Sequence, residues 1–192
     1  MVNDKRNKRL AADYREMLKI QDRPYLSWIV TKGEPPYAEE YLLSIRLRTY
    51  ALCVIGDRYA VGVMDHCTVK VTLWDSYPTI APNIRMLNIP PVFAPSWYSK
   101  GTYSPSAPWQ TDGSLKDYVL QMLKGMIYDP SAIDPAAPAN YKALDWYNRN
   151  RDNAALFPSD RTELDENRPE DVAAIERAAV FDEIIDSWPI QR

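Results

Sequence analysis

The chain has 192 residues, of which 46% are hydrophobic and 26% charged, enough for one packed domain with an additional segment. Its net charge of −3 lacks the basic excess of a nucleic-acid-binding protein, and no stretch approaches the ~20 consecutive apolar residues of a membrane helix. We therefore expect no nucleic acid and no membrane among its partners, and we predict no cofactor and no metal.

The N-terminal residues carry no apolar stretch of the kind that forms a secretory signal, so we expect a cytoplasmic protein. Cys53 and Cys67 both lie in apolar, strand-like surroundings. Because the cytosol keeps thiols reduced, the sequence favours two buried, inert thiols over a disulfide.

The first predicted element is a helix over residues 4–20. Leu10, Tyr14, Met17 and Leu18 recur at helical spacing, and Pro24 ends the segment. The opposite face is basic and carries Lys5, Arg6, Lys8, Arg9, Arg15 and Lys19.

Strands are predicted next, at 25–31, 41–54, 59–64, 67–74 and 84–88. The alternation is clearest where Val69, Val71 and Leu73 alternate with polar residues, the pattern of a half-buried strand. Gly56 and Asp57 form a turn signal between two of the strands.

Residues 90–109 are rich in proline and serine and show no periodicity, and a loop of this length in a compact domain is usually functional or disordered. A helix is predicted over 114–128, an extended connector over 129–135 and another helix over 138–150. This order predicts an α+β fold with an antiparallel sheet and helices on one side and at the ends.

Beyond Pro158 the composition changes. Ten acidic residues oppose three arginines between Asp160 and Asp186, and a helix start is predicted at Asn167. This C-terminal amphipathic helix either docks on its own domain or engages the groove of a partner.

A run at residues 93–104 carries the strongest motif. It reads Phe-Ala-Pro-Ser-Trp-Tyr-Ser-Lys-Gly-Thr-Tyr-Ser and resembles the active-site segment of ubiquitin-conjugating enzymes, which reads Phe/Tyr-His-Pro-Asn and closes with Gly-x-x-Cys. The proline and Gly101 match. Ala94 replaces the family's His, Ser96 its Asn, and Ser104 its nucleophilic Cys.

Other parts of residues 4–150 resemble the family in the same order. The segment from Trp74 to Pro82 is similar to its Tyr-Pro turn, which RWD adaptor domains share, and Trp109 follows as a Trp follows the family's Cys. Two Asp-Pro pairs, at Asp129 and Asp134, match its connector in spacing. The resemblance implies a conjugating domain over residues 1–152, with an N-terminal helix, a four-stranded antiparallel meander, a long active-site loop and two helices, and an acidic extension over 153–192 with one more helix.

The resemblance implies a carrier that accepts a ubiquitin-like protein from an activating enzyme and passes it to a protein or other acceptor. Ser104 would carry it as an oxyester, Asp134 would assist transfer and Ser96 would support the loop. A nucleophilic serine needs a base or oxyanion stabilisation, and His66, the only histidine, is expected at a strand end away from the site. Asp112 could also reach the site.

Alternatives remain open for each of these residues. Ser104 could be a loop serine in a non-catalytic adaptor, and Asp134 could cap the backbone before a helix. In the family the first helix receives the activating enzyme, so Lys5, Arg6, Lys8 and Arg9 are predicted to bind it, or else form a solvated face. The tail helix could instead make the chain a scaffold. The degenerate motif and short loop point to a bacterial ubiquitination-like pathway.

Overall fold

The computed structural model describes residues 2–55, 58–157 and 164. Its helices are α1 (Val2–Leu18), α2 (Leu115–Met126) and α3 (Tyr141–Asn150), with a short 3-10 helix η1 (Pro130–Ala132). Its strands are β1 (Leu26–Lys32), β2 (Glu40–Ile45), β3 (Thr49–Ile55), β4 (Arg58–Met64), β5 (Cys67–Thr72) and β6 (Asn83–Met86). The predicted α+β class is confirmed, with three α-helices and antiparallel sheets in these ranges.

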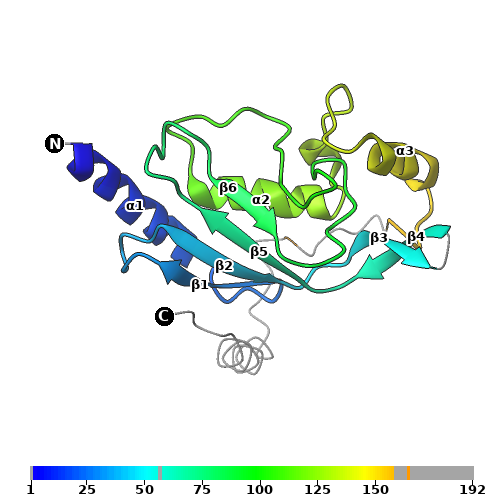
Figure 1. Cartoon of the computed structure of the whole chain (residues 1–192), viewed down its shortest axis with the longest axis horizontal. Helices are drawn as coiled ribbons and strands as arrows, with labels where there is room; N and C mark the ends of the chain where they lie inside the picture. Colours follow the sequence, from blue (N-terminus) through cyan, green and yellow to red (C-terminus); the bar gives the residue numbers. More distant parts are fainter. Residues whose placement is uncertain (1, 56–57, 158–163, 165–192) are drawn as a thin grey trace.

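Four strands form one antiparallel sheet in the order β1-β2-β5-β6, and β3 and β4 form a separate hairpin between β2 and β5. The segment predicted as one strand over 41–54 is therefore divided at residues 46–48. Figure 1 shows the result: the hairpin extends beyond the sheet and lies beside α3, while α1 lies at the opposite end of the molecule.

The core lies between α2 and the sheet. Val69 and Val71 of β5 are fully buried, as their alternation with polar residues predicted. The apolar stripe predicted for α2 is buried as well, and Val119, Met122 and Met126 contribute to it. On α1 the prediction fails at one position, because Leu18 is 45% exposed. The connector predicted as extended contains η1, in which Asp129 caps the turn by accepting from the Ser131 amide at 2.8 Å.

No helix in the described ranges is both long enough and apolar enough to span a membrane. The acidic extension predicted over 153–192, and its helix from residue 167, lie almost entirely outside the described residues.

A buried carboxylate joins α1 to the rest of the domain. Asp13, which is 3% exposed, accepts from Arg9 at 2.5 Å, from the Tyr77 hydroxyl at 2.5 Å and from the Leu115 amide at 3.1 Å. Burial raises the pKa of Tyr77, and the Asp13 charge raises it further, so the phenol stays protonated and donates. Asp13 thereby ties the first helix to the start of α2 and to the turn after β5.

Asp13→Ala should therefore destabilise the domain severely. It would leave the Arg9 charge without its carboxylate and the Leu115 amide without its acceptor, at a cost of about 3–5 kcal/mol in the free energy of unfolding. Urea unfolding measures this cost. Asp4→Ala is the matched control, since its pair with Lys8 is exposed, and it should cost less than about 0.5 kcal/mol. Equal effects of the two substitutions would refute the structural role of Asp13.

Candidate functional site

The run 93–104 forms a compact loop that is closed by its own backbone. The Ser104 amide donates to the Ser96 carbonyl at 2.8 Å, and the Tyr98 amide donates to Thr102 at 2.9 Å. Gly101 has a φ of +82°, and a side chain there would approach Met86 and Pro91 at 3.3 Å. The glycine is thus required by backbone conformation and by space.

Both the sheet and the helices hold this loop. The Gly101 carbonyl accepts from the Met86 amide at 2.7 Å, and the Tyr103 amide donates to Ile84 at 3.1 Å, so the end of the run lies along β6. The Asn140 amide, just before α3, donates to the Pro95 carbonyl at 3.1 Å. The path of the run is therefore fixed by contacts with β6 and with the residue before α3.

Ser104 lies at the end of the run between the buried Tyr103 and Pro105, and it is half-buried. Its backbone amide is engaged, but no hydrogen bond of its hydroxyl is found within the described part of the chain. The backbone of Ser104 is therefore held in place, while its hydroxyl oxygen makes no hydrogen bond to any described residue.

Asp134 lies in the connector before α3. Its Oδ1 accepts from the Ala136 amide at 2.8 Å and from the Ala137 amide at 3.3 Å, which is the capping role that the sequence left open. Its Oδ2 takes part in no hydrogen bond among residues that the structure describes. One carboxylate oxygen therefore caps the turn, and the other makes no hydrogen bond to a described residue.

Gln121 of α2 links the two segments, a residue that the sequence gave no reason to single out. Its Nε2 lies 3.4 Å from the Ser106 hydroxyl and 3.3 Å from the Ser131 carbonyl. Ser106 follows Ser104 by two positions, and Ser131 precedes Asp134 by three. The loop that carries Ser104 and the connector that carries Asp134 therefore converge on one side chain of α2.

Ser96 does not present its hydroxyl as expected for oxyanion support. The residue is 6% exposed, and its Oγ is shielded from solvent with no hydrogen-bond partner in the described ranges. The oxygen packs against Gly125 of α2, where a β-carbon would lie only 2.3 Å away. Ser96 supports the loop through its carbonyl, which accepts from the Ser104 amide.

The two other residues considered for the site lie elsewhere. Asp112 is exposed in a turn whose neighbours Thr111 and Gly113 accept from Arg9 of α1. His66 lies between β4 and β5, as predicted, and its Nε2 is 2.9 Å from the Ser44 hydroxyl. Within the described ranges, no group of acidic, histidine and cysteine side chains is arranged to hold a metal ion.

The basic face predicted on α1 divides into two pairs. Lys5 and Lys8 are exposed. Arg6 and Arg9 have side chains only 14% and 17% exposed: Arg6 pairs with Glu39 at 2.8 Å, and Arg9 belongs to the Asp13 cluster. Both guanidinium groups bind within the domain, and the contact of this face with an activating enzyme stays a prediction.

The two cysteines are free thiols, in line with the expectation of no disulfide. Cys67 is buried, which raises the pKa of its thiol to about 12 and makes it unreactive at neutral pH. Cys53 is half-buried.

No family model matches the sequence, and no curated protein matches it. Among solved structures, the human ubiquitin-conjugating enzyme E2 G1 is similar, with a TM-score of 0.46 and 13% identity over 65% of this chain and 95% of that chain. We assign no family from a likeness at this level.

The contact between Ser96 and Gly125 predicts that the effect of Gly125→Ala on stability depends on the side chain at position 96. Gly125→Ala should cost about 1–2 kcal/mol in the free energy of unfolding, because the new methyl group meets Ser96 Oγ. In a Ser96→Ala background the cost should be much smaller, because only the β-carbon of residue 96, 3.3 Å away, remains in contact and alanine favours a helix by up to about 1 kcal/mol. Urea unfolding of the four proteins in this cycle tests the contact, and an equal effect of Gly125→Ala in both backgrounds would exclude it.

His66 should make stability depend on pH. Burial lowers its pKa in the folded domain, and the Arg46 charge lowers it further, so protonation favours the unfolded chain. The contribution of His66 to the free energy of unfolding is fully present above the unfolded-state pKa of 6.5. It is lost as the pH falls below that value. The free energy of unfolding should therefore drop more between pH 7 and pH 5 in the wild type than in His66→Gln. Parallel pH profiles would contradict this.

Proposed function

We propose that this chain is a ubiquitin-conjugating-enzyme-like carrier in which Ser104 accepts the C-terminal acyl group of a ubiquitin-like protein. The observation that supports the proposal most strongly is the placement of Ser104. Its backbone is held by the Ser96 carbonyl at 2.8 Å, and the residue is half-buried at the end of a loop that resembles the family's active-site segment. A positioned nucleophile reduces the entropic cost of acyl transfer.

In the loading step, Ser104 Oγ attacks the carbonyl carbon of a thioester on an activating enzyme. A C–O bond forms, the C–S bond breaks and the sulfur leaves as a thiolate, while the hydroxyl proton passes to the free oxygen of Asp134 or to water. In the second step an amine attacks the oxyester, and Ser104 recovers its proton as the C–O bond breaks. We assign this role to Asp134 because Ser106, near Ser104, and Ser131, in the connector of Asp134, both contact Gln121 of α2.

Recognition of the activating enzyme falls to the exposed lysines of α1. Lys5 and Lys8 lie on the surface, whereas Arg6 and Arg9 are engaged inside the domain. We propose that these two lysines contact an acidic surface of the activating enzyme, and that the two arginines fix the helix that carries them.

A non-catalytic adaptor is the second candidate function. Two observations favour it: one oxygen of Asp134 caps the following turn, and the Ser96 hydroxyl faces α2 instead of a substrate. An adaptor would bind the ubiquitin-like protein or its activating enzyme without forming a bond to Ser104.

Mixing the full chain with a C-terminal thioester of ubiquitin separates the two functions. The carrier should form an adduct that resists thiols, is released by hydroxide and is absent from Ser104→Ala. Ser99→Ala, which alters an exposed serine of the same run, should retain the adduct. Ser104→Cys should form an adduct that thiols release.

The Ser104→Cys protein also controls for access to the site. If it is loaded while the wild type is not, Ser104 is not an acyl acceptor. If neither protein is loaded, the run does not accept the C-terminus of ubiquitin, and a carrier function toward ubiquitin is excluded. An adaptor predicts binding that Ser104→Ala leaves unchanged.

A further inference from the structure

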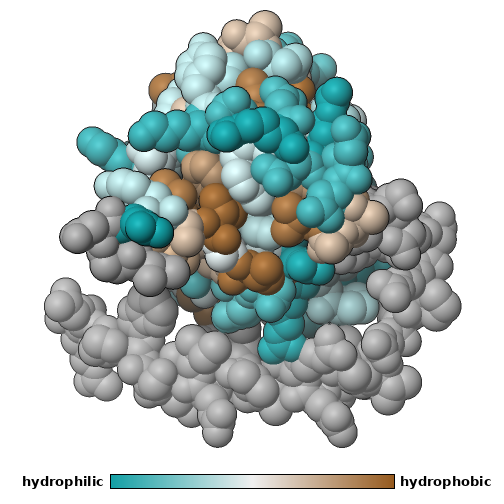
Figure 2. All heavy atoms as spheres, turned by 90° about the vertical axis from the view of Figure 1, so that its right-hand side faces the viewer, coloured by the Kyte–Doolittle hydropathy of each residue, from teal (hydrophilic) through white to brown (hydrophobic). Residues whose placement is uncertain are grey.

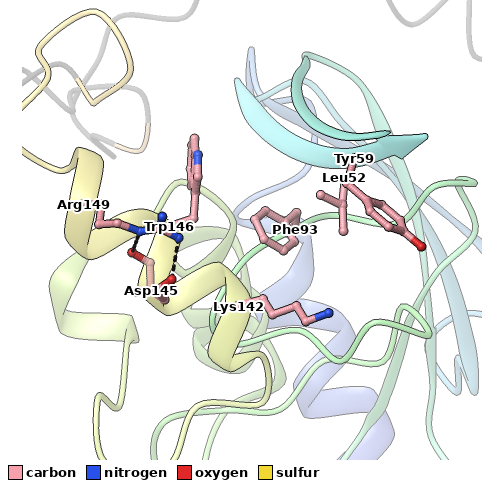
Figure 3. A pocket seen from close by; sticks show the side chains of 7 residues that line it. All are labelled: Leu52, Tyr59, Phe93, Lys142, Asp145, Trp146 and Arg149. Atoms are coloured by element: carbon pink, nitrogen blue, oxygen red, sulfur yellow. Dashed lines mark hydrogen bonds and ion pairs between the residues drawn. The ribbon is translucent and has the colours of Figure 1, made fainter. Parts of the chain in front are cut away.

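An apolar groove lies between the β3–β4 hairpin and α3. It has a volume of about 350 Å³ and is lined by Leu52, Tyr59, Phe93, Lys142, Asp145, Trp146 and Arg149. In Figure 3 the apolar side chains of the hairpin and Phe93 face α3 across an open space. Figure 2 shows the same end of the molecule, where apolar residues gather in a hollow with hydrophilic residues around it.

One wall of the groove is an exposed apolar face of the hairpin. Val54 and Tyr59 are cross-strand partners, and they are 67% and 75% exposed. Leu52 and Val61 form the next pair on the same face. A two-stranded hairpin is marginally stable by itself, and apolar surface of this kind usually marks a contact.

The rim of the groove carries a positive excess. Arg149 pairs with Asp145 at 2.5 Å, which neutralises one charge. Lys142 is exposed, and no ion pair of its ammonium group is found in the described part of the chain. Arg58, at the start of β4, is also exposed. An occupant that is apolar on one side and acidic on the other would fit this groove.

Residues 156 and 157 pack beside this groove. Phe157 is buried, and its ring lies 5.5 Å from that of Trp146, which lines the groove. The Leu156 carbonyl accepts from the Tyr50 hydroxyl at 2.6 Å, which fixes the last turn against β3.

A segment of matching chemistry follows in the sequence, outside the described residues. Its apolar members, Phe181, Ile184, Ile185 and Trp188, have the i, i+3, i+4, i+7 spacing of one helical face. Its acidic members, Asp182, Glu183 and Asp186, fall between them. The spacing puts apolar and acidic residues on opposite faces.

We propose that the groove binds residues 181–188 of the same chain, with the apolar face against Tyr59 and Phe93 and the acidic residues toward Lys142. Leu164 packs against the core, and the 17 residues from there to residue 181 reach roughly 55 Å when extended, which still allows docking. A tether of this kind gives an effective concentration in the order of millimolar, which populates even a modest contact. The proposal is independent of any chemistry at Ser104.

Hydrogen exchange on the full chain tests the proposal. Amides within residues 181–188 should exchange about tenfold or more slowly than in an unstructured peptide, and Tyr59→Ser or Trp188→Ser should remove this protection. Tyr59 is exposed, so its replacement should leave the fold intact. Tyr37→Ser, which changes an exposed tyrosine (47%) between β1 and β2, should have no effect. Exchange at unstructured rates, or protection that survives Tyr59→Ser, would overturn the proposal.

A photo-cross-linking amino acid at position 59 identifies the occupant. In an equal mixture of ¹⁵N-labelled and unlabelled protein, the cross-link should join position 59 to residues 181–188 of the same isotopic chain. A cross-link between labelled and unlabelled chains would show that a second copy fills the groove, and the absence of any cross-link to this segment would also refute the intramolecular arrangement.

Discussion

The close approach of the 93–104 run to α2 is the constraint on which the candidate site depends. Gly125 has no side chain, and only for this reason can Ser96 pack on the helix with its Oγ 2.3 Å from the place of a β-carbon. The Ser96 carbonyl in turn holds the Ser104 amide. The position of the proposed nucleophile thus depends on a missing methyl group one helix away, and interiors packed this closely transmit small changes in volume.

The elements with strong hydrophobic periodicity could be predicted from sequence, because each of them packs one face against a single core. Val69 and Val71 of β5 and the stripe of α2 face one core, so local pattern and final structure agree. The break at 46–48 could not be predicted. Tyr50 turns toward Trp146 of α3, with the ring centroids 4.9 Å apart, and that contact joins residues far apart in the chain. The local hydrophobic pattern of the sequence cannot predict such a long-range contact.

Within the site, a motif residue could be predicted where the backbone conformation requires it. It could not be predicted where its role depends on the side chain that it contacts in the folded domain. Gly101 must be glycine for its φ of +82°. The sequence alone, however, does not distinguish a solvated charged residue from a buried one. Arg9 is internal only because Asp13 and Tyr77 receive it, and Gln121 matters only because two loops meet there. The contacts thus hold the backbone of the 93–104 run in place, and Asp134 is the polar side chain proposed to assist Ser104.

The central claim is that the oxygen of Ser104 carries an acyl group, and mass spectrometry tests it most directly. The full chain would be loaded with ubiquitin thioester, digested at a pH that preserves esters and sequenced by tandem mass spectrometry. The account predicts the C-terminal ubiquitin fragment in ester linkage on the peptide that contains Ser104, and on that residue within it. An unmodified Ser104 peptide, or the fragment attached to a lysine or another serine, would contradict it.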